Sequence, residues 1–106
     1  MKAELKEAME AAEMDATMLV GQAAATITLD YSDALTLAAF RAIQRSERTD
    51  HPTDQYKAKL ACEAWMEANE AQAMTVIAAR KAKRDAYKAE LARPNTAAEI
   101  DKMLGM

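Results

Sequence analysis

From Thr53 to Ala92 the chain reads TDQYKAKLACEAWMEANEAQAMTVIAARKAKRDAYKAELA, without a single Gly or Pro. Nearly every residue of this stretch is a good helix former, chiefly Ala, Lys, Glu, Gln, Arg and Met. The composition therefore predicts one long helix over residues 53–92. We expect the other helices to pack along it.

A row of small side chains follows one side of the expected long helix at heptad spacing. Its members, which we call the alanine seam, are Ala61, Ala64, Ala68, Ala71, Thr75, Ala78, Ala82, Asp85, Ala89 and Ala92. Small side chains let two helix backbones approach closely, so the seam indicates a packing surface. Because Ala accounts for 26 of the 106 residues, the alternative is that composition alone produces the spacing.

The middle of the long helix, residues 73–79, carries no charge over almost two turns. Such a segment is apolar on all sides and favours neighbours on more than one side. We therefore expect residues 73–79 to lie at the centre of the core.

Charges are segregated along the same stretch, with Glu63, Glu67 and Glu70 before the uncharged middle. The basic residues that follow it are Arg80, Lys81, Lys83, Arg84 and Lys88. Two copies paired antiparallel would bring opposite charges together, which predicts a homodimer through the seam, with Ala64, Ala68, Ala71, Thr75, Ala78 and Ala82 in contact. The alternative is that the acidic first helix of the same chain covers the basic half.

The rest of the chain reads as three further helices. Steps of three or four between apolar residues predict a first helix over 2–28 and a second over 33–47. The N-cap of the long helix is expected among Thr49, Asp50 and His51 in the loop before it. A capping box at Thr96 predicts a short helix over 97–104 that folds back onto the long helix or serves as a docking tail. Gly21 is expected to mark a bend or a close helix crossing.

Length and composition bound the fold class. A chain of 106 residues with two Gly and two Pro is expected to form one all-α domain, residues 1–106, of three main helices and a short C-terminal one. Half of the apolar content is Ala, so the core is thin, which favours oligomerisation or a partner. The net charge of −3, the single Cys62 and the polar N-terminus fit a cytoplasmic protein without a membrane span.

Residues that carry chemistry are few. One His and one Cys, eleven positions apart, offer no metal cluster, and a phosphate-binding glycine loop has no glycines to build it. We therefore expect no enzyme activity, no metal and no cofactor. Nucleic-acid binding is a minor alternative because the net charge is negative; its contacts would be Lys81, Lys83, Arg84 and Lys88.

The function predicted from these observations is protein binding. Residues 1–33 hold seven acidic residues and two lysines, a formal charge of −5. We expect a small inhibitor or adaptor whose acidic first helix occludes a basic site on a larger protein, through Glu4, Glu7, Glu10, Glu13 and Asp15. In size and alanine-rich make-up the chain resembles small accessory proteins of phages and mobile elements. A dimeric structural or assembly protein is the second hypothesis.

Overall fold

The computed structural model describes residues 2–92 and 96–105, and all regular structure among them is helical. The helices are α1 (Ala3–Ala11), α2 (Ala16–Thr26), α3 (Ala34–Arg48), α4 (Pro52–Ala68), α5 (Glu70–Ala92) and α6 (Thr96–Met103). The all-α class is therefore confirmed. Two of the expected helices are each divided in two, and both divisions shape the molecule.

The long helix expected over residues 53–92 is interrupted at Asn69, so this prediction was wrong. Asn69 has φ −126° and ψ 48°, outside the helical region, and its amide and its side-chain Nδ2 both donate to the carbonyl of Trp65, at 2.9 and 3.0 Å. Asn favours such local bonds over a continuing helix because its side chain competes for backbone groups. Asn69 thus closes α4 while its own carbonyl accepts from Ala73 in α5.

The first expected helix, residues 2–28, is divided as well. Glu13 has a positive φ of 54°, a left-handed conformation that ends α1, and Asp15 then caps α2 by accepting from the Met18 amide at 2.8 Å. Gly21 marks no bend and no close crossing. It lies within α2, and a Cβ built on it would meet nothing within 4 Å.

The second expected helix is confirmed as α3, within one residue at each end. Its cap is Asp33, whose carboxylate accepts from the Thr36 amide at 3.0 Å. His51 caps α4, as expected for that loop: its Nδ1 accepts from Thr53, and Pro52 occupies the first turn, where no amide proton is needed.

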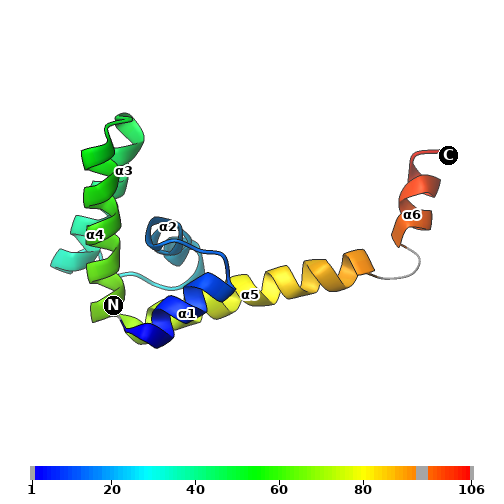
Figure 1. Ribbon diagram of the computed structural model, residues 1–106, viewed down its shortest axis with the longest axis horizontal. Coiled ribbons are helices and arrows are strands. Elements are labelled where there is room, and N and C mark those ends of the chain that lie inside the picture. The colour runs from blue at the N-terminus through cyan, green and yellow to red at the C-terminus, as the bar shows by residue number, and fades with distance from the viewer. Residues whose placement is uncertain (1, 93–95, 106) are drawn as a thin grey trace.

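The core lies in the angle between α4 and α5, where α2 is enclosed (Figure 1). α1 packs on α5, and α3 packs on α4. The largest fully buried side chains are Trp65, Leu5, Leu19, Met66, Val20, Val76 and Cys62. A buried hydrogen bond joins α4 to α3, with Trp65 Nε1 donating to Thr36 Oγ1 at 3.0 Å. The bend at Asn69 therefore wraps a single apolar face around α2.

The expected core centre, residues 73–79, is only partly correct. Ala73, Val76 and Ile77 are buried, whereas Thr75 and Ala78 are exposed and Met74 retains 40% of its surface. The segment therefore has neighbours on one side instead of all around.

The molecule is elongated, with extents of 53 × 31 × 24 Å and a radius of gyration of 17.5 Å. A compact domain of this length would have a radius of about 13 Å. The outer half of α5, residues 81–92, causes the difference because it projects from the body with α6 beyond it (Figure 1). Met103 and Leu104 are exposed in this C-terminal region, so they do not fold back onto α5; the side chain of Ile100 lies outside the described residues.

Within the described part of the chain, every helix falls short of the length and apolarity that a bilayer crossing demands.

Candidate functional site

The acidic row of α1 is held in a defined orientation by the opposite side of the same helix. Leu5 and Met9 are buried against the body, which leaves Glu4, Glu7 and Glu10 exposed. At 100° per residue these three carboxylates follow one another along the outer side of α1. Three of the five residues predicted to bind a partner therefore form one continuous surface, which we call the acidic row.

The other two predicted partner-binding residues have roles inside the chain. Glu13 forms an ion pair with Arg84, with 3.0 Å between Oε1 and Nη2. Asp15 caps α2, and the bonds that its carboxylate accepts from Met18 and Thr17 hold its pKa below the usual value. Both residues belong to the turn between α1 and α2 and lie beyond the acidic row.

The first helix packs on α5, but of the basic half that the intramolecular alternative expected it to cover, only Arg84 is engaged within residues 2–92. Lys2 pairs with Glu70 at 2.9 Å, and Arg84, which pairs with Glu13, also donates to the carbonyl of Ala11 at 3.4 Å. The N-terminal end of α1 thus lies beside the N-terminal end of α5, so the two helices run parallel. The cover ends at the level of Arg84.

From Ala68 onward the alanine seam does not pack inside the chain. Ala64 is half-buried, whereas Ala68, Ala71, Thr75, Ala78 and Ala82 are all exposed. The buried stripe of α4 and α5 comprises Ala58, Cys62, Trp65, Met66, Ala73, Val76 and Ile77. At 100° per residue the seam lies on nearly the opposite side of α5 from this stripe, whereas on α4 the two are only about 110° apart. On α5 the seam is therefore available only to another molecule.

The antiparallel pairing expected of two straight helices loses its geometric basis. Glu63 and Glu67 lie on α4, which leaves the line of α5 at Asn69. They cannot face Lys88 and Arg84 of a second copy along one straight seam. Self-association through α5 alone is not affected by this correction.

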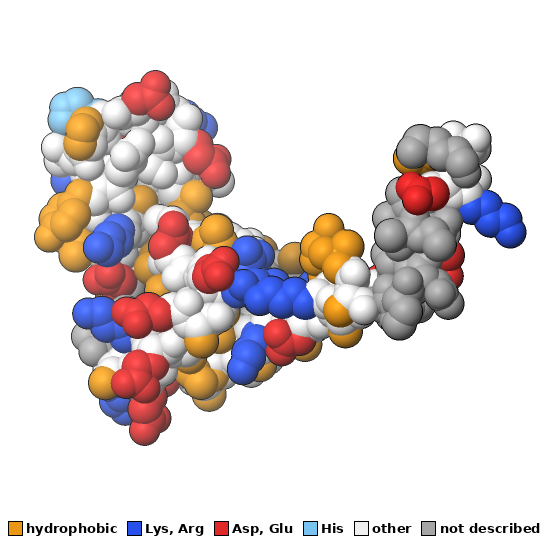
Figure 2. Space-filling view, turned by 45° about the vertical axis from the view of Figure 1, so that its right-hand side comes forward, with side chains coloured by type: hydrophobic (Ala, Val, Ile, Leu, Met, Phe, Trp, Pro, Cys, Tyr) orange, Lys and Arg blue, Asp and Glu red, His pale blue; other side chains and the backbone are white. Residues whose placement is uncertain are grey.

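The basic residues proposed for nucleic-acid contact gather where α5 leaves the body (Figure 2). Lys81, Lys83 and Lys88 are exposed, whereas Arg84 is half-buried and paired with Glu13. Three of the four predicted cations are therefore presented to solvent on one projecting segment.

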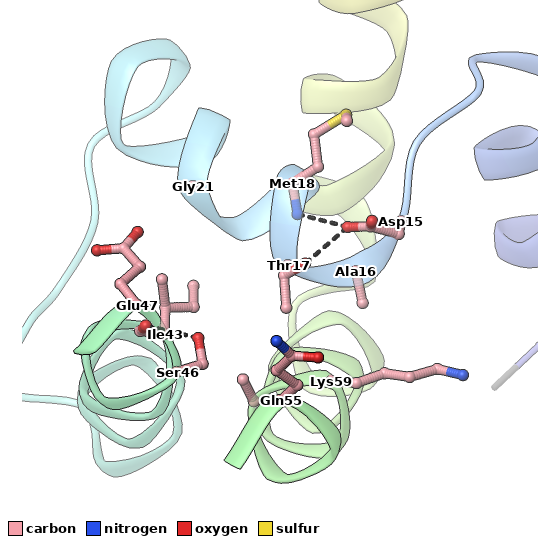
Figure 3. Close-up of a pocket in the computed structure, with 11 residues that line it drawn as sticks. Asp15, Ala16, Thr17, Met18, Gly21, Ile43, Ser46, Glu47, Gln55 and Lys59 are labelled. Carbon is pink, nitrogen blue, oxygen red and sulfur yellow. Dashed lines mark hydrogen bonds between the residues drawn. The ribbon is translucent and has the colours of Figure 1, made fainter. Parts of the chain in front are cut away.

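A groove of about 690 Å³ lies between α2, α3 and α4, and no pattern in the sequence predicted it. Figure 3 shows Thr17 of α2 facing Ile43 and Ser46 of α3 across it, with Gln55 of α4 on the third side, whereas the side chains of Met18 and Lys59 extend away. Ala16 and Ala58 complete the apolar floor. The groove exists because three helices meet here with small residues, a feature that requires the tertiary arrangement.

The two residues with chemical reactivity are both engaged in the fold. Cys62 is fully buried, and burial raises the pKa of its thiol to about 12, so the reactive thiolate is scarce at neutral pH. The imidazole of His51 serves as the cap of α4. Among the described residues no three or more His, Cys, Asp or Glu side chains come together in a way that could hold a metal ion.

Comparison with known proteins returned no matching family model, no matching curated protein and no matching solved structure.

Proposed function

We propose that the protein is a non-enzymatic protein-binding module, a small inhibitor or adaptor, that contacts a basic surface of a larger protein through the acidic row of α1. The observation that carries this proposal is the fixed presentation of Glu4, Glu7 and Glu10 on a helix anchored by Leu5 and Met9. A helix already docked on its own protein loses little conformational entropy when a partner binds it. Opposite charge then guides encounter and orientation.

The test compares a charge-reversed protein with a matched control. The variant Glu4→Lys, Glu7→Lys, Glu10→Lys should lose the captured partner in a pull-down with tagged protein. A control with the same change in net charge, Glu47→Lys, Asp50→Lys, Asp101→Lys, uses exposed acids elsewhere and should retain it. Equal capture by both variants would show that the acidic row is not the contact surface.

Glu13 and Asp15 are left unchanged in this test. Replacing either one removes an ion pair or a helix cap, so reduced binding would have two explanations. Circular dichroism of both triple variants should match that of the parent protein because all six positions are exposed.

The second candidate function is a structural or assembly role through the seam on α5. Ala71, Thr75, Ala78 and Ala82 form an exposed row of small side chains that would let a second helix approach closely. If this row pairs two copies, sedimentation equilibrium should show a dimer whose fraction rises with concentration. Replacing Ala78 with Glu should abolish that dimer, and a monomer over the whole concentration range would argue against this role.

A further inference from the structure

The helix face that carries the buried stripe of α5 continues beyond the last residue that α1 covers. In steps of three or four it runs from Ala73 through Val76 and Ile77 to Arg80 and Arg84, and then to Tyr87 and Leu91. The first three are buried, the two arginines are half-buried, and Tyr87 and Leu91 retain 66% and 55% of their surface. The same helix face is thus an interface near the body and solvent-exposed beyond Arg84.

Within the chain, an acidic amphipathic helix covers the inner part of this face. That helix is α1, which contributes Leu5 and Met9 to the shared core and is followed by Glu13, the ion-pair partner of Arg84. The face therefore packs against apolar side chains of a helix, and one of its cations, Arg84, pairs with a carboxylate.

Charges on the projecting segment favour the same kind of occupant. Residues 81–92, which we call the arm, have four cationic and two acidic side chains. On a helical wheel Lys81 and Lys88 flank Tyr87 and Leu91 on one side, and Lys83 together with Glu90 flanks them on the other. An apolar pair with a cationic edge on one side, on a segment whose cations outnumber its acids by two, is complementary to a helix with apolar residues bordered by acidic ones.

A second copy of the arm fits this face less well. In an antiparallel pair related by a two-fold axis, each edge of one helix meets the same edge of its partner. Lys81 and Lys88 would then face Lys81 and Lys88 of the second copy, and like charges on neighbouring side chains repel. Nucleic acid would use the lysines but would leave Leu91 without an apolar neighbour.

We propose that the arm is a docking site for an acidic amphipathic helix of a partner protein, which packs on Tyr87 and Leu91 and pairs with Lys83 and Lys88, continuing the face that α1 covers. This surface is separate from the acidic row and opposite to it in charge. The contact is small, so the expected Kd is on the order of 10–100 µM.

The test uses two labelled synthetic peptides of about 20 residues, long enough to form helices. Both have Leu at helical steps of three and four; the acidic peptide has Glu on both edges and the basic peptide has Lys. Fluorescence anisotropy with the full chain should show saturable binding of the acidic peptide only. Binding of the basic peptide with equal affinity, or of neither peptide at millimolar protein, would overturn the proposal.

Matched variants locate the site on the arm. Tyr87→Ala with Leu91→Ala should weaken binding of the acidic peptide at least about tenfold, as expected for central apolar contacts. Tyr56 and Leu60 on α4 have the same four-residue spacing and similar exposure, at 60% and 45%, but no buried stripe continues into them. The control Tyr56→Ala with Leu60→Ala should bind the peptide normally. Equal loss in both pairs would overturn the proposal.

Charge variants separate this partner from the alternatives. Lys83→Glu with Lys88→Glu should weaken acidic-peptide binding about tenfold, whereas Lys57→Glu with Lys59→Glu should not. If a DNA duplex binds more tightly than the peptide and ignores Tyr87→Ala with Leu91→Ala, the arm is a nucleic-acid contact instead. If sedimentation shows a dimer that this same apolar pair of substitutions dissociates, the occupant is a second copy.

Discussion

The hydrogen bond from Trp65 to Thr36 is expected to contribute more to stability than any other single polar contact in the protein. It joins α4 to α3 across 29 positions of sequence, and both residues are buried, at 1% and 3% exposure. In Thr36→Val the shape of the side chain is nearly retained while the acceptor for Trp65 Nε1 is lost. Water cannot replace the acceptor at a buried site.

A buried donor left without a partner costs about 1–3 kcal/mol. Thr36 Oγ1 also contacts the capping carboxylate of Asp33 at 3.0 Å, although the cap itself uses the Thr36 amide and is retained in the valine variant. We therefore expect Thr36→Val to lower the free energy of unfolding by about 2 kcal/mol. At roughly 4 °C per kcal/mol for a chain of this size, Tm should fall by about 8 °C.

Urea denaturation monitored by circular dichroism measures this change, with Trp65 fluorescence as a second probe wherever Trp65 is present. Thr36→Ser keeps the hydroxyl and should cost less than about 1 kcal/mol, the value of one buried methyl group. In a Trp65→Phe background there is no indole donor to lose its partner, so Thr36→Val should cost less than about 0.5 kcal/mol there. If Thr36→Val costs the same in both backgrounds, the hydrogen bond is not what stabilises this contact.

Three further predictions concern single residues. Gly21→Ala should raise the free energy of unfolding by about 0.5–1 kcal/mol in urea denaturation, because Gly21 is inside α2 and a Cβ there meets nothing within 4 Å. A destabilised variant would show that the space around Gly21 is not open. Asp15→Ala should cost about 1 kcal/mol through loss of the α2 cap, and the depressed pKa of Asp15 means that its contribution is present at neutral pH and is lost as the pH falls through the folded-state pKa. Cys62 should react with a thiol reagent only after unfolding, and fast labelling of the native protein at pH 8 would show that the thiol is accessible. Because the pKa of Cys62 rises from 9.0 to about 12 on folding, its contribution to stability is full below pH 9 and falls as the pH rises from there toward 12. Cys62→Ala should remove this pH dependence of the free energy of unfolding.

The positions of the breaks explain most of what the sequence analysis missed. Asn69 is the one Asn between residues 53 and 92, and it lies in line with the buried stripe, so a signal for the interruption was present. It was outweighed by the strong helix formers on both sides. The alanine seam misled for a related reason: the abundance of Ala produced a regular row, while on α5 the buried stripe lies on the opposite side of the helix.

The functional surfaces likewise include some features that the sequence predicts and others that it does not. The acidic character of the first helix could be predicted because it depends on spacing within a few turns. That Glu13 and Asp15 are engaged in the turn, and that only Glu4, Glu7 and Glu10 form a common surface, follows from the left-handed residue at position 13. The groove between α2, α3 and α4 has no counterpart in any single stretch of sequence.

The sequence by itself determined that this chain is helical, because helix propensity, capping residues and apolar periodicity act over a few neighbouring residues. It also determined where α3 begins, through Asp33, and where α4 begins, through His51 and Pro52. Only the tertiary structure decided that α4 and α5 bend at Asn69. A break in a helix costs little locally, and enclosing α2 between two helices buries apolar surface that one straight helix would leave exposed. The same arrangement leaves Tyr87 and Leu91 uncovered, because α1 ends before it reaches them.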